Sequence, residues 1–412
     1  MPEYSFLKAR LRIMMFLQFF VWGAWYATAG NYMKNTGMTD VIYLAYMASP
    51  IGSIVSPFFL GMIADRFFAV QKVMGVMHLL SGIFVFCAPF VAEGAFVSPP
   101  LFLTLLLLHM LCYMPTLGLA TAMAFHTLTD RDRAFPLIRA FGTIGWIAAG
   151  FLVSYVLDAD TTALPMHIAG AVGVMMGIYS FTLPHVPPPA AGKKASFRDI
   201  TGLNALAQLR SKPFVVFIMS LLLISIPLAT YYAYVPVFLR DANIPNPAFK
   251  MTFGQMSEVL FLLLMPWFFV KWGIKRVMIV GMSAWALRYG LFALGAPDAL
   301  VGVILTGILL HGVCYDFVYI AGQIYIDKKA QPAIRAQAQG LFVLVTYGVG
   351  QGLGTLVAGW IFNRMVGEGT QSLQQWQTFW IVPLIFAAVV TLMFALGSRE
   401  ELPVKQESAP VS

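Results

Sequence analysis

The chain has 412 residues, of which 59% are hydrophobic and only 11% are charged, and its mean hydropathy is +0.78. A soluble domain is about 45–50% apolar and about 25% charged, so the composition excludes an ordinary soluble protein and indicates many membrane spans. The formal net charge of +8 does not indicate nucleic-acid binding. The Lys and Arg residues are scattered singly between apolar runs, where the positive-inside rule accounts for them. We therefore expect the lipid bilayer, and no nucleic acid, as a partner.

The apolar runs are long and lack the alternation of a membrane barrel, so we expect them to be helices. A spanning helix needs about 20 apolar residues, and the chain divides into about twelve such runs. The predicted spans are 11–32, 41–64, 72–92, 100–126, 136–157, 165–184, 213–239, 251–270, 275–295, 299–325, 333–362 and 377–397.

The longest polar stretch, which is Pro-rich and then basic, separates the sixth span from the seventh. It predicts an N-terminal six-helix bundle (1–184), a cytoplasmic linker (185–212), a C-terminal six-helix bundle (213–398) and a cytoplasmic tail (399–412). Most of the 26 Lys and Arg residues fall on the side of the linker and both termini. This asymmetry predicts that both termini face the cytoplasm.

Two short motifs recur in the second half of the chain at nearly the same offset. "PLIRA" at 136–140 returns as "PAIRA" at 332–336, and "QKVM" at 71–74 returns as "KRVM" at 275–278. Duplicated halves of equal orientation, six spans each, are the major-facilitator pattern. The expected fold is therefore an all-α membrane protein with about twelve transmembrane helices in two parallel six-helix repeats.

The turn after the second span reads "GMIADRFFAVQK". It resembles the G-x-x-x-D-R/K-x-G-x-x-x-K/R signature of the major facilitator superfamily, although the second glycine is absent. Asp65 and Arg66 are candidates for a gating charge clasp that breaks when the two halves rock. The alternative is that they are ordinary loop charges.

Four charged residues fall inside predicted spans, namely Arg139, Glu258, Arg288 and Asp316. A charge at the middle of a membrane costs about 2.5–3.5 kcal/mol, so such residues usually face the interior of the bundle. Asp316 is a candidate proton carrier, because its protonation can change with exposure. The alternative is a static ion pair, with Arg288 as the candidate partner.

Two groups of polar residues have the spacing of one helix face. Arg139, Thr143 and Trp146 are spaced i, i+4, i+7, and a cation, a hydroxyl and an aromatic ring suit a polar ligand. Gln255 and Glu258 are spaced i, i+3 and can hydrogen-bond the hydroxyls of a neutral solute. The alternatives are that Arg139 snorkels to the membrane surface and that Gln255 and Glu258 form a structural pair.

The seventh span carries a cluster of tyrosines, in which Tyr231 and Tyr234 share one face and Tyr232 lies on another. Each hydroxyl within lipid needs a partner, and aromatic walls with polar groups suit a planar ring that carries a sugar. A lone histidine such as His311 is interpreted first as a packing residue. No metal-ligand spacing, nucleophile–base pair or phosphate loop is present, so an enzyme is not expected.

The whole pattern resembles the bacterial nucleoside:proton symporters, the nucleoside permease branch of the major facilitator superfamily. The resemblance covers nearly the whole chain and rests on stretches such as "FLQFFVWGAWYATAGNYM", "FPLIRAFGTIGW", "GIKRVMIVGMSAWALRYGLFALG" and "CYDFVYIAGQIYIDKKAQPAIRAQAQGLF". It implies twelve helices around a central cavity and transport by alternating access.

The resemblance also implies roles for individual residues. It places substrate binding at Arg139, Thr143, Trp146, Gln255, Glu258, Tyr315 and Tyr232, and proton coupling at Asp316. The seventh span departs from the family, because Ala229 and Tyr232 stand where the permeases carry amide side chains. The tenth span has His311 where a tyrosine is usual.

The sequence thus predicts a proton-driven importer of nucleosides in a bacterial inner membrane. We expect a monomer that uses protons as the coupling ion and no other cofactor. One alternative is a facilitator-type symporter of sugars or another small polar metabolite. A more distant alternative is a membrane sensor without transport activity.

Overall fold

The structure, a computed structural model, describes residues 2–59, 67–94, 97–188, 209, 211–331, 334–367 and 372–398. Across these residues the chain is helical and contains no strand. Nine helical stretches of the described part are long and apolar enough to cross a membrane. The prediction of an all-α membrane protein is therefore confirmed.

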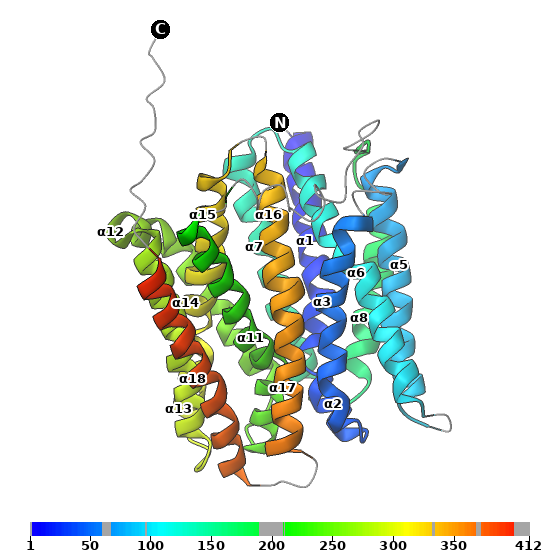
Figure 1. Cartoon of the computed structure of the whole chain (residues 1–412). Helices are drawn as coiled ribbons and strands as arrows, with labels where there is room; N and C mark the ends of the chain where they lie inside the picture. Colours follow the sequence, from blue (N-terminus) through cyan, green and yellow to red (C-terminus); the bar gives the residue numbers. More distant parts are fainter. Residues whose placement is uncertain are drawn as a thin grey trace.

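The helices of the first half are α1 (Pro2–Tyr26), α2 (Ala29–Asn35), η1 (Thr39–Val41), α3 (Ile42–Phe59), α5 (Val70–Cys87), η3 (Ala88–Val91), α6 (Pro99–Thr127), α7 (Arg131–Gly150), η4 (Phe151–Val156) and α8 (Leu164–Ser180) (Figure 1). The helices of the second half are α11 (Lys212–Asp241), α12 (Pro247–Gly295), α13 (Val301–Leu309), α14 (His311–Tyr315), η5 (Asp316–Ile320), α15 (Ala321–Lys329), α16 (Arg335–Val343), η7 (Leu344–Gly350), α17 (Gln351–Met365) and α18 (Leu373–Gly397). Of these, η4, η5 and η7 are π-helical segments.

Within the described residues, each predicted span falls largely on helix, while 60–64 of the second span and 333 of the eleventh lie outside them. Two of them, 251–270 and 275–295, lie in the 49-residue α12, which consists of two helices joined at Gly273. The φ angle of Gly273 is 73°, in the left-handed region that glycine adopts without strain. The nine long helical stretches thus account for ten predicted spans, because α12 holds two of them. The shorter helices α3 and α8 account for the other two.

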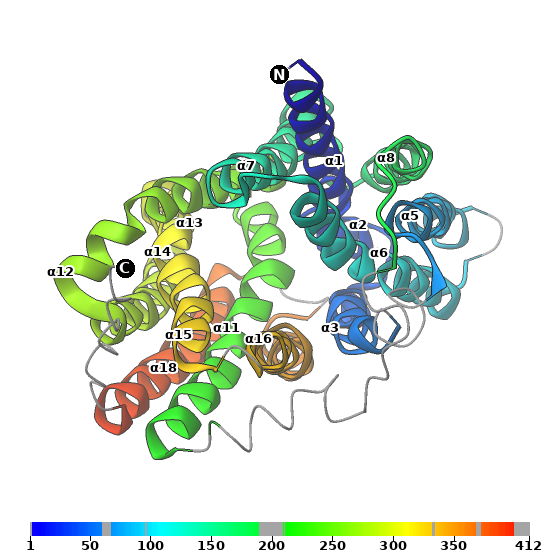
Figure 2. The same ribbon diagram turned by 90° about the horizontal axis from the view of Figure 1, so that it is seen from above.

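The helices form two groups that lie side by side (Figure 2). Within the first group α1 packs on α7 and α5 packs on α8, and within the second group α12 packs on α18. The groups meet where α3 packs on η7 and α17, and where α7 and η4 pack on α12. The ends of the linker and of the tail stay predictions, because 189–208, 210 and 399–412 lie outside the described residues.

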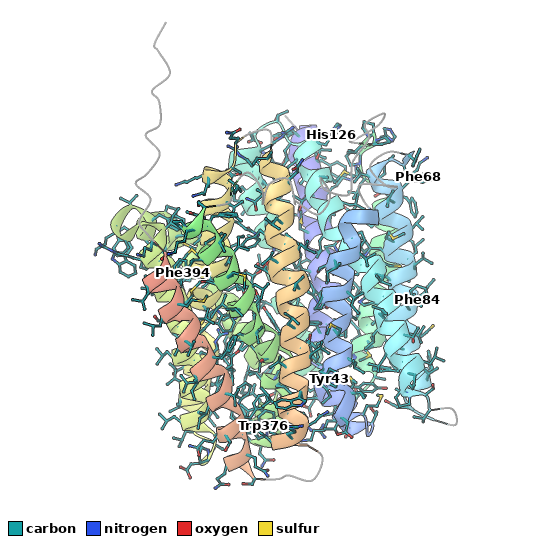
Figure 3. All side chains as sticks on the ribbon, in the orientation of Figure 1. Tyr43, Phe68, Phe84, His126, Trp376 and Phe394 are labelled. Carbon is teal, nitrogen blue, oxygen red and sulfur yellow. The ribbon has the colours of Figure 1, made fainter. Side chains whose placement is uncertain are left out.

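The outer surface of the bundle is strongly apolar. Leu263 is 75% exposed, Val270 90% and Leu396 78%, and side chains such as Phe84 cover the outer faces of the helices along their length (Figure 3). A surface of this kind and extent is stable in lipid rather than in water. Two charged side chains of the spans, Arg288 and Asp316, are buried inside.

Helix α7 is held unusually close to α1 by glycine on both helices. A Cβ atom at Gly145 would lie 2.2 Å from the carbonyl oxygen of Phe16, and one at Gly23 would lie 2.9 Å from the Cα atom of Trp146. Small residues allow backbones to approach in this way within membranes. The contact fixes the position of α7, which carries Arg139, Thr143 and Trp146.

We expect Gly145→Ala to lower the free energy of unfolding by about 1–3 kcal/mol, because the added methyl group forces α7 away from α1. The measurement is the melting temperature of the purified protein in detergent. Gly302→Ala is the matched control, since a Cβ atom there meets nothing within 4 Å and alanine favours helix. Equal melting temperatures for the two variants would contradict the close packing described here.

Candidate functional site

A cavity of about 740 Å³ lies between the two groups of helices. Its walls come from α1, α3, α6 and α7 of the first half and from α11, α12, α14, η7 and α17 of the second. This volume includes space open to solvent, and the lining combines aromatic rings with a few polar groups, as ligand sites commonly do. Both halves of the molecule therefore contribute to one site.

All of the residues predicted to bind substrate line this cavity. They are Arg139, Thr143, Trp146, Tyr232, Gln255, Glu258 and Tyr315. These residues come from four helices that are distant in sequence. The structure brings them together at the interface between the halves, although their roles remain predictions.

The wall from the first half is built on α7 and α1. The Arg139 guanidinium lies 4.2 Å from the centre of the Phe19 ring, a cation–π contact. The Trp146 and Trp22 ring centres are 5.4 Å apart in an edge-to-face arrangement. Arg139 thus lines the cavity, and the alternative that it snorkels to the membrane surface does not describe this structure.

The wall from the second half carries a connected polar group. The Tyr232 hydroxyl lies 3.2 Å from His311 Nε2, and the direction of that hydrogen bond depends on the histidine tautomer. The same nitrogen lies 4.0 Å from a carboxylate oxygen of Glu258. Gln255, one turn before Glu258, is 5% exposed, and its Oε1 has no hydrogen-bond partner among the described residues.

Arg139 and Glu258 place opposite charges on the two halves. They lie close enough to sense each other's charge, yet no ion pair between them is found among the described residues. A ligand between them can donate hydroxyl groups to the carboxylate and accept from the guanidinium. The arrangement is suited to a polar, uncharged solute.

Asp316 is fully buried, and neither carboxylate oxygen has a hydrogen-bond partner in the described part of the chain. It lies directly after Tyr315, which lines the cavity, and it begins the π-helical segment η5. Segments of this kind occur frequently at functional sites. Asp316 and Glu258 also lie close enough to sense each other's charge.

The alternative of a static pair between Asp316 and Arg288 receives no support. Arg288 donates from Nε to the carbonyl oxygen of Gly307 at 3.0 Å, and its guanidinium lies 4.2 Å from the Tyr231 ring centre and 4.7 Å from that of Trp285. The buried arginine is therefore stabilised by aromatic faces and one carbonyl. Nothing among the described residues pairs with the Asp316 carboxylate.

The sequence did not single out several residues of the cavity wall, including Tyr26, Ser49, Tyr347 and Gln351. Tyr347 shares a hydrogen bond with Tyr315 through the two hydroxyl groups. The sequence offered little indication of Tyr347, because a single tyrosine in an apolar run looks like an ordinary packing residue of a buried helix.

Two tyrosines of the seventh span differ from expectation. The hydroxyl groups of Tyr231 and Tyr234 are buried and have no hydrogen-bond partner among the described residues, although a partner was predicted for each. The rings compensate in part, since Tyr231 stacks on His311 with ring centres 5.0 Å apart and Tyr234 stacks on Phe362 with ring centres 4.4 Å apart.

The predicted gating residues Asp65 and Arg66 lie outside the described residues.

Within the described part of the chain, no group of three His, Cys, Asp or Glu residues is arranged to hold a metal ion.

The family model described as "Nucleoside H+ symporter" matches residues 6–402. The chain belongs to this family of transporters. The predicted family is therefore confirmed, and with it the prediction that the protein is not an enzyme. The family assignment also agrees with a multi-pass membrane protein.

Three relatives from Escherichia coli (strain K12) match nearly end to end. YegT is 36% identical over 95% of this chain and 94% of its own length. The nucleoside permease NupG is 31% identical over 94% of this chain and 95% of its own length. A xanthosine permease is 30% identical over 95% of this chain and 96% of its own length.

The crystal structure of the nucleoside transporter NupG superimposes on this structure with a TM-score of 0.84 at 30% identity, covering 95% of this chain and 98% of that one. A POT family transporter, 14% identical, superimposes with a TM-score of 0.73 over 95% of this chain and 97% of that one. The latter likeness concerns the fold alone. The predicted major facilitator fold is confirmed.

We expect Tyr232→Phe to raise the KM for nucleoside uptake about fivefold, since a typical hydrogen bond contributes about 1 kcal/mol and the variant loses the hydroxyl that faces His311. Tyr234→Phe is the matched control, because it removes an unpartnered hydroxyl from the same helix outside the cavity. The measurement is initial uptake of radiolabelled uridine and adenosine into proteoliposomes. An equal KM for the two variants would remove Tyr232 from the site.

Proposed function

We propose that the protein imports nucleosides together with protons by alternating access. The observation that carries the proposal is the cavity between the halves, which Arg139 and Glu258 line from opposite halves, together with the buried Asp316, whose carboxylate has no hydrogen-bond partner among the described residues. Family membership supports the same reaction. The named nucleoside and xanthosine permeases among the relatives support a nucleoside as the substrate.

The cavity offers the two kinds of surface that a nucleoside requires. The rings of Trp22, Trp146 and Tyr315 provide apolar walls for a planar base. Glu258 and Arg139 provide an acceptor and a donor for sugar hydroxyls and base edges. A nucleoside carries both parts in one molecule, whereas a simple sugar uses only the polar groups.

Asp316 is the group that we assign to proton coupling. An unpartnered carboxylate inside a membrane protein is costly as an anion, by several kcal/mol. Asp316 therefore carries a proton in the conformation seen here, and it releases that proton when a change of conformation admits water. Glu258 lies in electrostatic range, so ligand bound at Glu258 and protonation of Asp316 affect each other.

The driving force suffices for accumulation. One proton supplies about 1.4 kcal/mol per pH unit and about 2.3 kcal/mol per 100 mV of membrane potential. One pH unit and 100 mV together supply about 3.7 kcal/mol, which supports accumulation of a neutral solute by about 500-fold. Protons serve as the coupling ion in this proposal, and no further cofactor is required.

The distribution of Lys and Arg supports an inner-membrane protein with both termini in the cytoplasm. In that orientation the end of the bundle that carries the termini faces inward (Figure 1). We propose that the transporter acts as a monomer, since one chain supplies every wall of the cavity.

A sugar symporter is the second candidate, because the maltose permease of Geobacillus stearothermophilus is 21% identical over 371 residues. Competition separates the two candidates. Unlabelled nucleosides, and not sugars, should inhibit the uptake of labelled uridine.

We expect Asp316→Asn to abolish accumulation of uridine driven by an inward proton gradient, because the amide cannot carry the coupling proton. Exchange of internal for external nucleoside should persist, since the cavity wall is intact. Asp298→Asn is the control, since Asp298 is an exposed carboxylate outside the spans. Uptake into proteoliposomes with and without the gradient is the measurement, and gradient-driven accumulation by Asp316→Asn would refute the role of Asp316.

A further inference from the structure

The two halves are tied together by hydrogen bonds at the end away from the termini. Lys34 Nζ lies 2.6 Å from both carboxylate oxygens of Asp241, and the Trp376 indole donates to the same carboxylate at 3.1 Å. Trp376 marks that end of the bundle in Figure 3. Arg240 donates from Nη1 to the carbonyl oxygen of Asn31 at 2.9 Å. These bonds join α2 to α11 and α18.

A second tie at the same end is centred on Asp160, in the connection between η4 and α8. Asp160 Oδ1 accepts from the backbone N–H of Ala248 at 2.9 Å, and Oδ2 accepts from the Ser154 hydroxyl at 2.5 Å. Asn246 Nδ2 donates to the carbonyl oxygen of Ser154 at 2.7 Å. Residues 154 and 160 belong to the first half, whereas 246 and 248 belong to the second.

The bond to Ala248 is a helix cap supplied by the opposite half. Helix α12 begins at Pro247, and its own N-cap residue, Asn246, makes no side-chain cap hydrogen bond. The first N–H groups of a helix lack partners within the helix, and a carboxylate at this position satisfies one of them and favours the helix dipole. Separation of the halves at this end would therefore uncap α12.

The cap also removes a carboxylate from water. Asp160 is 6% exposed. The charged groups that act on it are Asp158 in the same connection and Lys250 on α12, and Lys250 donates to the carbonyl oxygen of Pro245 instead of to Asp160. Burial raises the pKa of the Asp160 carboxyl, Asp158 adds to this, and the Ser154 and Ala248 hydrogen bonds oppose it.

The sign of the pH effect follows from these contacts. A group whose pKa is higher in the joined state than in the separated, hydrated state binds its proton more tightly when joined. Acid therefore favours the joined state, and the advantage is lost as the pH rises. Protonated Asp160 keeps both bonds, since Oδ1 still accepts from Ala248 and the new O–H can donate to Ser154.

We propose that Asp160 is a gate residue of the transport cycle, which closes the outer end of the transporter by capping α12 from the opposite half. The inference rests on the proposed alternating-access function and on the proposed orientation, in which this end faces outward. External acid then promotes closure behind a loaded substrate. Asp160 would act on a step distinct from the protonation of Asp316.

The test measures the gate directly. Spin labels are placed at Glu93→Cys and Asp298→Cys, two exposed residues in connections of opposite halves at this end, after Cys87, Cys112 and Cys314 are replaced. Double electron–electron resonance in nanodiscs then gives the ratio of open to closed outer ends. The Asp316→Asn background removes the other proposed proton site from the pH response.

In the parent, we expect the open-to-closed ratio to rise as the pH is raised above about 4, the ordinary pKa of Asp, because the joined state loses its bound proton only at higher pH. Asp160→Ala should raise the ratio about three- to thirtyfold at low pH, the usual range for loss of a helix cap, and should abolish its dependence on pH. Asp160→Asn keeps an acceptor for Ala248 and a donor for Ser154, so it should hold the low-pH ratio at every pH. Asp158→Asn, an exposed neighbour whose φ of 48° asparagine tolerates, is the control. It keeps the cap, so at low pH, where it is compared with Asp160→Ala, it should give the ratio of the parent. Its pH response should move to lower pH, because the Asp158 charge no longer raises the pKa of Asp160.

The proposal is overturned if Asp160→Ala gives the same ratio as Asp158→Asn, or if Asp160→Asn keeps the pH response of the parent. Should Asp160→Ala fail to fold, Ser154→Ala removes the hydrogen bond within the first half that orients the Asp160 carboxylate towards Ala248. It should increase the open fraction, and an unchanged fraction would overturn the proposal as well. The distance measurement requires no substrate, so it tests the gate separately from transport. If the protein transported no nucleoside but showed the expected open-to-closed ratios, the proposed function would be rejected and the role of Asp160 in closure would stand.

Discussion

A charge inside a membrane protein must find its compensation within the protein, because lipid supplies no hydrogen bonds. Arg288 meets this constraint in part, with two aromatic faces and one carbonyl group, while its Nη1 and Nη2 have no hydrogen-bond partner among the described residues. Asp316 is equally buried and has no hydrogen-bond partner among the described residues. The neutral acid is therefore the form that this conformation stabilises. A site that holds a proton in one conformation and releases it in another is what a proton-coupled carrier requires.

The remaining charges follow from the same constraint and from the division into two halves. Arg139 and Glu258 stay unpaired at the cavity because they stand on opposite halves, each facing the same space. In the proposed cycle, a ligand that bridges them would draw the halves together, and its departure would let them part. The close contact of α7 with α1 through Gly145 makes this wall rigid, so movement is directed to the interface between the halves instead of being absorbed within one of them.

Much of the fold and of the cavity wall could be predicted, because apolar length determines spans and helical spacing determines faces. Arg139, Thr143 and Trp146 illustrate the second point, since one turn of helix separates each from the next. The hydrogen bond between Tyr232 and His311 joins residues 79 positions apart. It depends on how α11 packs near α14, which no local pattern encodes. The cap of α12 by Asp160 escaped prediction for the same reason, and the π-helical turn at Asp316 depends on tertiary packing.

The central claim is that nucleoside and proton cross the membrane together. Its most direct test records the pH inside proteoliposomes with a trapped dye while nucleoside is added outside, with no pH gradient imposed and with the interior held electrically negative. Addition of uridine, adenosine or inosine should acidify the interior, and maltose should not. An interior pH that stays constant while labelled nucleoside enters would contradict the account, and so would acidification by maltose alone.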